Sequence, residues 1–360
     1  MPYINEDLNK ILEIQEEYLE NNDDTNVTPH SNIYSYTETR SCYDLVRMIS
    51  DKDLRRDPEF QRNDVWDIPQ KTRFIDSLLK KLPIPSMCFS VDSNDNYLTI
   101  DGRQRIGAIL EFFSQENLEN RLSELDDIDE RISGKSLQEI RTNNPEVFKT
   151  IGNFSIPINV IKCDYKRKDN LSYIYNIFHR LNTGGLKLNN QEIRNCIYQG
   201  NFLDLINNCN KNEKWVLWVN NLAKNKRMKG TERILLFFCM YNELENYENK
   251  LSSFMNNFLA DHQHSETVWI DKQKNIFIQT INIASQIELN TTRSIYIDAV
   301  LYGIAKNIES CKTKSKEELQ GLYEKLLKSS AFEFKKLQDG TSNKKKLFER
   351  YDTARIIFGE

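Results

Sequence analysis

Apolar residues between positions 41 and 113 follow alternating helical and strand spacings. Ser41 stands ahead of Leu45, Val46 and Ile49 and predicts the start of a helix. Asp67 and Pro69 predict a second helix start, and this helix runs to Pro83. Two short apolar runs follow, over 86–91 and 97–100, with a polar loop between them that is typical of a hairpin. A third helix is expected over 103–113.

The rest of the chain divides into a mixed part and a helical part. A polar stretch over about 115–150 is expected to be peripheral, and residues 154–163 read as a strand. A helix over 171–181 ends at a Gly-Gly pair, and from about residue 188 only helical patterns occur. The predicted fold class is therefore α+β followed by an all-helical region. We expect an N-terminal helical segment over 1–30, an α+β domain over 31–187 and a helical domain over 188–360.

Composition narrows the classes of protein that the chain can represent. The 360 residues include 18 Phe, 16 Tyr and 4 Trp, which suffice for a sizeable core, and Gly and Pro are scarce. No apolar run approaches the roughly 20 residues of a membrane helix, and the N-terminus lacks the pattern of a secretory signal. The seven cysteines are scattered, without a C-x-x-C pair, and read as buried reduced thiols. We expect a cytoplasmic protein with no membrane partner and no organic cofactor.

The net charge of −4 belongs to one short segment. Residues 1–30 hold eight acids and one base, so the remaining residues carry a small positive excess. The overall acidity therefore leaves nucleic acid open as a partner.

The sharpest chemical feature is the stretch Ile100-Asp101-Gly102-Arg103-Gln104-Arg105, where a strand turns directly into a helix. A helix N-terminus suits an anion, and arginine forks match phosphate oxygens. Two bases in a first helical turn oppose the helix dipole, and a bound phosphate would account for them. Asp101 could hold Mg²⁺ or position a water. The alternative is that both arginines pair with Asp101 and neighbouring acids.

Two further segments carry polar residues in settings that suit a ligand. The first is PEFQRNDVW, in which Gln61 and Arg62 lie between Phe60 and Trp66. The second is the helix end FHRLNTGGLK, where a Gly-rich loop could approach a ligand. The alternatives are an aromatic anchor for a loop and an ordinary helix stop. The candidate residues of the second segment are Arg180, Asn182, Thr183, Gly184 and Gly185.

A weaker signal for nucleic acid surrounds Trp215 and Trp218. Bases contact phosphates and aromatic rings can stack on nucleobases. The alternative is a solvated helix face over buried tryptophans. The candidate nucleic-acid contacts are Lys224, Lys226, Arg227 and Lys229.

In this order, the segments PEFQRNDVW, IDGRQRIGAI and FHRLNTGGLKLNNQEIRNCIY resemble the N-terminal domain of GmrSD-type restriction endonucleases. The resemblance covers roughly residues 35–260 and implies a ParB/sulfiredoxin-like fold with a small mixed sheet. It also implies nucleotide binding and hydrolysis centred on a motif that is usually Asp-Gly-Gln-Gln-Arg. Arg103 stands here where Gln is commoner. Asp101, Gln104 and Arg105 are the implied catalytic residues.

The same resemblance sets the expected function and its alternatives. We expect a protein that binds and hydrolyses a nucleoside triphosphate, acting on or with DNA in bacterial restriction or phage defence. Many relatives continue into a histidine-based nuclease, but the last of the four histidines here is His264, so we expect no such half. One alternative is a nucleotide-gated DNA-binding protein or adaptor for a separate nuclease or defence protein, and another is a DNA-nicking enzyme. A homo-oligomer is compatible with each.

Overall fold

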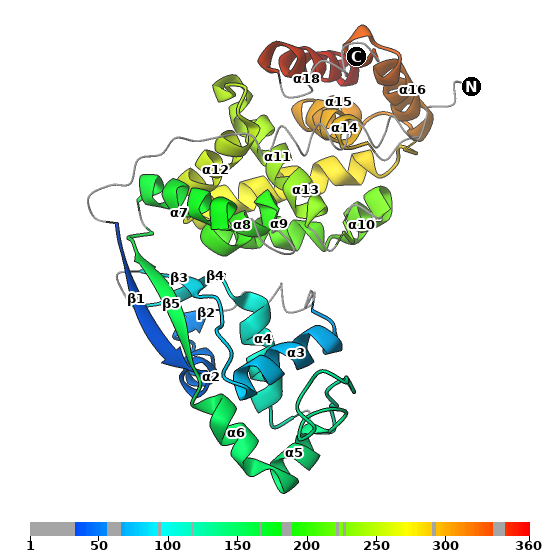
Figure 1. The fold of residues 1–360 in the computed structure, drawn as a ribbon. Coiled ribbons are helices and arrows are strands. Elements are labelled where there is room, and N and C mark those ends of the chain that lie inside the picture. Colours follow the sequence, from blue (N-terminus) through cyan, green and yellow to red (C-terminus); the bar gives the residue numbers. More distant parts are fainter. Residues whose placement is uncertain are drawn as a thin grey trace. The chain divides into compact units, whose positions relative to one another are not determined.

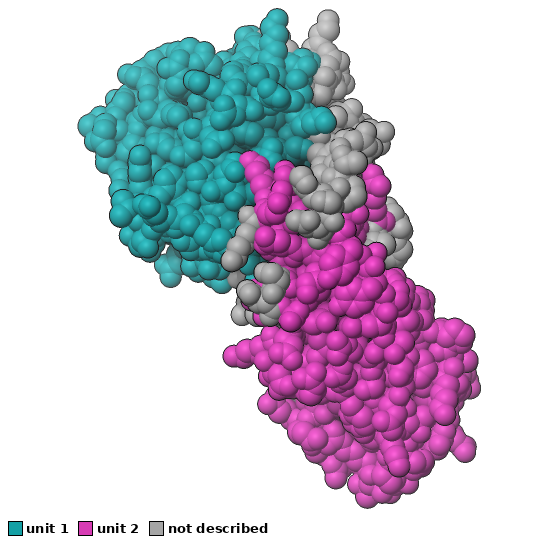
Figure 2. All heavy atoms as spheres, turned by 90° about the vertical axis from the view of Figure 1, so that its left-hand side faces the viewer, with its two compact units in different colours: residues 1–26, 188–360 teal, residues 27–187 magenta. Residues whose placement is uncertain are grey.

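The computed structural model describes residues 33–55, 66–92, 95–116, 118–165, 167–181, 189–220, 223–225, 228–289, 293–333 and 343–360. The backbone contacts divide the chain into two compact units, one of residues 27–187 and one that contains residues 188–360 (Figure 2). The expected helix near the N-terminus lies outside the described residues.

The first unit is built on a five-stranded mixed sheet (Figure 1). Its strand order is β1-β5-β3-β4-β2, and β5–β3 and β4–β2 are parallel pairs while β1–β5 and β3–β4 are antiparallel. The strands are β1 (Tyr34–Ser41), β2 (Leu54–Arg55), β3 (Met87–Val91), β4 (Tyr97–Asp101) and β5 (Ser155–Lys162). The three strands expected from the sequence are confirmed, and β1 and β2 are additions.

Helices cover both faces of this sheet. They are α2 (Cys42–Ser50), α3 (Ile68–Leu79), α4 (Arg103–Phe113), α5 (Leu137–Asn143), α6 (Pro145–Gly152) and α7 (Lys168–Leu181). Apolar side chains of α2, α3, α4 and α6 form one core with alternate residues of β3 and β5, such as Phe89 and Ile158. Residues of α7 lie over the opposite face, where the intervening residues Cys88 and Asn159 point. The sheet is therefore a middle layer.

The expectation that residues 115–150 are peripheral is wrong. Ile140 and Val147, on α5 and α6, are fully buried in the core below the sheet, and the ring of Phe148 stacks on Phe112 with centroids 4.5 Å apart. Apolar residues three and four positions apart form one face of each short helix. The polar residues between them hide this spacing in the sequence.

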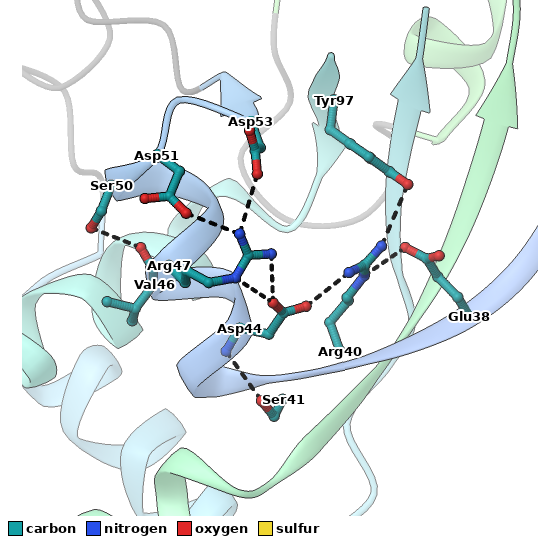
Figure 3. A network of polar contacts seen from close by, with 10 residues as sticks. All are labelled: Glu38, Arg40, Ser41, Asp44, Val46, Arg47, Ser50, Asp51, Asp53 and Tyr97. Atoms are coloured by element: carbon teal, nitrogen blue, oxygen red, sulfur yellow. Dashed lines mark hydrogen bonds and ion pairs between the residues drawn. The ribbon is translucent and has the colours of Figure 1, made fainter. Parts of the chain in front are cut away.

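A polar network fixes the path of the chain from β1 into α2 (Figure 3). The Ser41 hydroxyl accepts a hydrogen bond from the backbone N–H of Asp44 at 3.1 Å, as the capping prediction requires. The guanidinium of Arg40 donates to Glu38 and to Asp44, both at 2.9 Å, and Arg47 donates to the other oxygen of Asp44. Burial disfavours the charged carboxyl, but the hydrogen bonds from both arginines outweigh it and lower the pKa of Asp44.

The second unit is helical wherever the structure describes it, as expected from the sequence. Its α-helices are α8 (Asn190–Ile197), α9 (Asn201–Asn210), α10 (Glu213–Val219), α11 (Lys229–Glu243), α12 (Leu251–His262), α13 (Thr267–Ala284), α14 (Ser294–Lys306), α15 (Ile308–Cys311), α16 (Lys316–Leu327) and α18 (Lys344–Gly359). Short 3-10 turns occur at η3 (Leu244–Asn246) and η4 (Ser330–Phe332).

Two helices, α11 and α14, form the centre of this unit and are buried around most of their circumference. The side chain of Arg194, from α8, is completely buried. Its guanidinium donates to Glu232 at 3.2 Å, to Asn256 at 2.8 Å and to Ser252 at 2.9 Å. A buried charge of this kind is tolerated only because its donors have partners. The network therefore ties α8 to α11 and α12.

All seven cysteines are buried free thiols, so that prediction is confirmed. None of the described helices is long and apolar enough to cross a membrane.

The acid stability of the first unit is expected to depend on Asp129. Arg131 donates to both of its carboxylate oxygens, at 2.8 and 2.9 Å, and these hydrogen bonds lower the pKa of Asp129 to about 2. Because the pKa is lowered on folding, this stabilisation is present above the unfolded pKa of about 4 and is lost as the pH falls to about 2. We expect Asp129→Asn to cost about 2 kcal/mol near neutral pH and nothing near pH 2.

Urea unfolding of both proteins at several pH values measures this difference. Asp127→Asn is the control, because Asp127 is largely exposed and lies 3.5 Å from Arg73. A difference for Asp129→Asn that stays constant from neutral pH to pH 2 would contradict the assignment.

Candidate functional site

The turn between β4 and α4 requires glycine at position 102. Gly102 has φ +108°, a conformation that residues with a side chain rarely adopt. A Cβ atom at this position would lie 2.6 Å from Cγ and 2.8 Å from Sδ of Met87, the first residue of β3. The turn is thus pressed against the neighbouring strand. Gly102 serves as N-cap of α4, and no side chain caps the helix there.

Arg105 is held by the acid at the end of β4. Its guanidinium donates to Oδ2 of Asp101 at 2.6 Å and to the backbone carbonyls of Pro85 and Ser86. The Arg105 side chain is 13% exposed, whereas that of Asp101 is 47% exposed. For Arg105 the structure therefore favours the alternative in which the arginine pairs with Asp101. Arg103, at the first position of α4, is partly exposed.

Gln104 connects the motif to the end of the PEFQRNDVW segment. Its side-chain oxygen accepts a hydrogen bond from the backbone N–H of Trp66 at 3.3 Å. The Trp66 ring packs edge-on against Phe74, with centroids 5.5 Å apart, so the aromatic anchor named as the alternative for this segment is present. Gln61 and Arg62 themselves lie outside the described residues.

Asp101 lines a cavity of about 400 Å³ on the sheet face that α7 covers. The strands β1, β3, β4 and β5 and the helix α7 contribute to it, and a bulge in β3 between Cys88 and Phe89 places Cys88 opposite Asp101. Sequence reasoning missed most of its lining, because these residues are ordinary members of strands and a helix. Besides Asp101, its lining residues include Tyr34, Ser86, Cys88, Asn159, Tyr173 and Ile177.

Arg180 lies on the stripe of α7 that faces this cavity. Tyr173 and Ile177 line the cavity four residues apart, and Arg180 follows three residues later, on the same helical face. Arg180 is exposed. The loop residues predicted beside it, Asn182, Thr183, Gly184 and Gly185, lie outside the described residues.

The donor set of the cavity fits Mg²⁺ that arrives with a phosphate ligand. Among the described residues, no group of three His, Cys, Asp or Glu side chains lies close enough to hold a metal ion. Mg²⁺ is commonly bound by one or two carboxylates together with substrate phosphates and water. Asp101 is the one carboxylate in the described lining of this cavity, so it is the residue that would contact the ion.

Cys88 is not a nucleophile in this setting. Its thiol is 6% exposed, and burial, followed by the charge of Asp101, raises the pKa of Cys88 to about 12. The thiol therefore stays neutral at physiological pH and acts as an apolar wall.

The predicted nucleic-acid patch lies in the helical unit and is only partly described. Trp215 is completely buried and its indole N–H donates to Asn210 at 2.9 Å, so for Trp215 the alternative of a buried tryptophan is the one that holds. Lys224 and Lys229 are exposed, as phosphate contacts require. Lys226 and Arg227 lie outside the described residues.

Residues 43–199 match the family model described as GmrSD restriction endonuclease, N-terminal domain. This part of the chain is similar to that N-terminal domain. Neither the curated proteins nor the solved structures contain a match to the chain. The matched segment includes the whole strand–turn–helix motif, the cavity lining from Ser86 to Ile177, and α8 of the helical unit. It suggests a restriction or phage-defence context.

Replacing Gly102 by alanine is expected to destabilise the first unit by roughly 2–4 kcal/mol, because backbone strain and overlap with Met87 add together. Gly134→Ala is the matched control. Gly134 has φ +65°, but a Cβ there would approach Glu124 no closer than 3.4 Å. It should cost only about 1–2 kcal/mol.

Thermal and urea unfolding of the two variants separate strain from close contact. Equal destabilisation by Gly102→Ala and Gly134→Ala would show that the contact with Met87 adds nothing.

Proposed function

We propose that the chain binds and hydrolyses a nucleoside triphosphate at the β4–α4 turn, and that it acts with DNA in restriction or phage defence. The observation that carries this proposal is the position of Asp101. Its half-exposed carboxylate lines a cavity and stands two residues ahead of a helix that has no side-chain cap. An open helix N-terminus beside a cavity is suited to a phosphate group.

In this proposal each residue of the turn has a separate role in binding or positioning. Backbone N–H groups in the first turn of α4 and the guanidinium of Arg103 contact the phosphates. Arg105 is a positioning residue, because its 2.6 Å contact fixes the orientation of the Asp101 carboxylate. Gln104 holds Trp66, and with it the end of the segment that carries Gln61 and Arg62.

Asp101 would contact Mg²⁺ and orient the attacking water. Bound Mg²⁺ would neutralise charge that develops on the transferred phosphoryl group. Phosphoryl transfer needs mainly positioning and charge stabilisation, so a site of arginines and one carboxylate without a histidine base is sufficient. Arg180, on the cavity-facing stripe of α7, would approach the phosphates from the other side.

The test is a panel of the four ribonucleoside triphosphates with Mg²⁺, with and without plasmid DNA. We expect hydrolysis of at least one nucleotide, and Asp101→Asn should abolish hydrolysis while binding persists. Arg103→Ala should weaken binding roughly tenfold, as expected for loss of a charge-assisted hydrogen bond. Arg121→Ala is the control, because Arg121 is exposed in the same unit and pairs with Glu139.

Other results of this panel would decide for another function. Binding of a nucleotide without hydrolysis would support the adaptor alternative, and conversion of supercoiled to relaxed plasmid would support nicking. If no nucleotide binds, the proposal is wrong.

For the DNA partner, we propose that the exposed Lys224 and Lys229 contact phosphates. Each phosphate contact releases counterions, so the double variant Lys224→Ala/Lys229→Ala should reduce the slope of log affinity against log salt by about 1–2. Lys312→Ala/Lys325→Ala serves as control, since both lysines pair with acids of the same unit. An unchanged slope in the first variant would exclude these contacts.

A further inference from the structure

The cavity beside Asp101 has aromatic and apolar walls in addition to its acid. The Tyr34 ring, at the start of β1, is 56% exposed, and Tyr173 on α7 is half-buried. Cys88 and Ile177 add apolar surface, since the thiol of Cys88 stays neutral. A volume of about 400 Å³ falls within the range of small-molecule sites. A phosphate chain is polar on every side and would gain nothing from contact with aromatic and apolar walls.

Asn159 supplies an oriented polar group to the same cavity. Its Oδ1 accepts a hydrogen bond from the Thr37 hydroxyl at 3.0 Å, and its Nδ2 donates to the Ser86 hydroxyl at 3.1 Å. These two contacts fix which end of the amide is oxygen. A primary amide has two N–H donors and two oxygen lone pairs. Within the described residues, one N–H and one lone pair of the exposed Asn159 therefore remain for a ligand.

An adjacent donor and acceptor on an amide is the pattern that reads the edge of a nucleobase. Asparagine pairs in this bidentate manner with adenine, and the same two groups can complement the edges of other bases. Aromatic side chains meanwhile stack on the face of any base. The cavity combines both features with a carboxylate at the phosphate-binding turn.

We propose that this cavity is a nucleobase subsite, in which Tyr173 stacks on the base and the Asn159 amide contacts its edge. The inference rests on the proposed function, because it places the base of the nucleoside triphosphate whose phosphates contact the β4–α4 turn. It adds that recognition of the nucleotide depends on the base as well as on the phosphates.

The first test compares binding of the four nucleoside triphosphates with binding of inorganic tripolyphosphate, by calorimetry on the full chain. At least one nucleotide should bind more tightly than tripolyphosphate. Tyr173→Ala should weaken that nucleotide roughly tenfold and leave tripolyphosphate unchanged, because stacking involves the base alone. Tyr173→Phe keeps the ring and should retain the affinity, so it controls for the change at this position.

The second test uses Asn159→Ala, with the exposed Asn153→Ala of the same unit as control. Loss of the amide should narrow the differences in affinity among the four nucleotides, again without effect on tripolyphosphate. Circular dichroism of each variant confirms that the unit remains folded.

The outcomes separate this inference from the proposed function. If nucleotides and tripolyphosphate bind equally well and Tyr173→Ala changes neither, the base subsite is wrong and the phosphate site stands. If neither probe binds the parent chain, the proposed function is wrong and the base subsite falls with it.

Discussion

The close approach of Gly102 to Met87 is the constraint on which the candidate site depends. Because Gly102 has no Cβ atom, the turn at the end of β4 can lie directly against Met87 of β3. This close packing fixes the point at which α4 starts. Asp101 at the end of β4 and Arg105 in the first turn of α4 are then brought together across the turn, and their 2.6 Å ion pair follows from that placement. A residue other than glycine would move the helix start, the acid and the arginine together.

The site uses its charges in two ways. Arg105 is largely buried and satisfies Asp101 and two carbonyl groups, so it shapes the site. Asp101 keeps half of its surface exposed, and Arg103 is partly exposed. Because the largely buried Arg105 holds the half-exposed Asp101, the carboxylate of Asp101 has a fixed orientation at the cavity. A contact with a metal ion or a water molecule would require such a fixed carboxylate. Arg105 thus helps to hold the carboxylate of Asp101 in place before any ligand binds.

The helical unit shows the same principle of paired charge in its core. Glu232 and Arg233, buried just ahead of the apolar run of α11, would be costly without partners. Arg194 and Asp298 provide them, at 3.2 and 3.1 Å. Since α8 belongs to the matched family segment and α11 does not, the network connects the GmrSD-like segment to helices beyond the match.

Local signals in the sequence determined the elements that surround the motif. Ser41 and Asp67 act as helix caps, and apolar runs bounded by turns form β3 and β4. These features depend on neighbours within a few residues, which is why the chain alone predicts them. The order of motifs likewise predicts the similarity to the GmrSD N-terminal domain.

Features that depend on residues far apart in the sequence were decided only by the tertiary structure. β1 has mostly exposed polar and aromatic residues, so its pairing with β5 carries no alternating apolar pattern. Asn159 and Tyr173 come from elements that meet only in the folded unit, and nothing in their local sequence places them beside Asp101. The basic residues around Trp215 in the sequence likewise do not reveal that its side chain is buried, because its burial depends on helices far along the chain. The motif was local and therefore predictable, whereas the cavity is a product of packing.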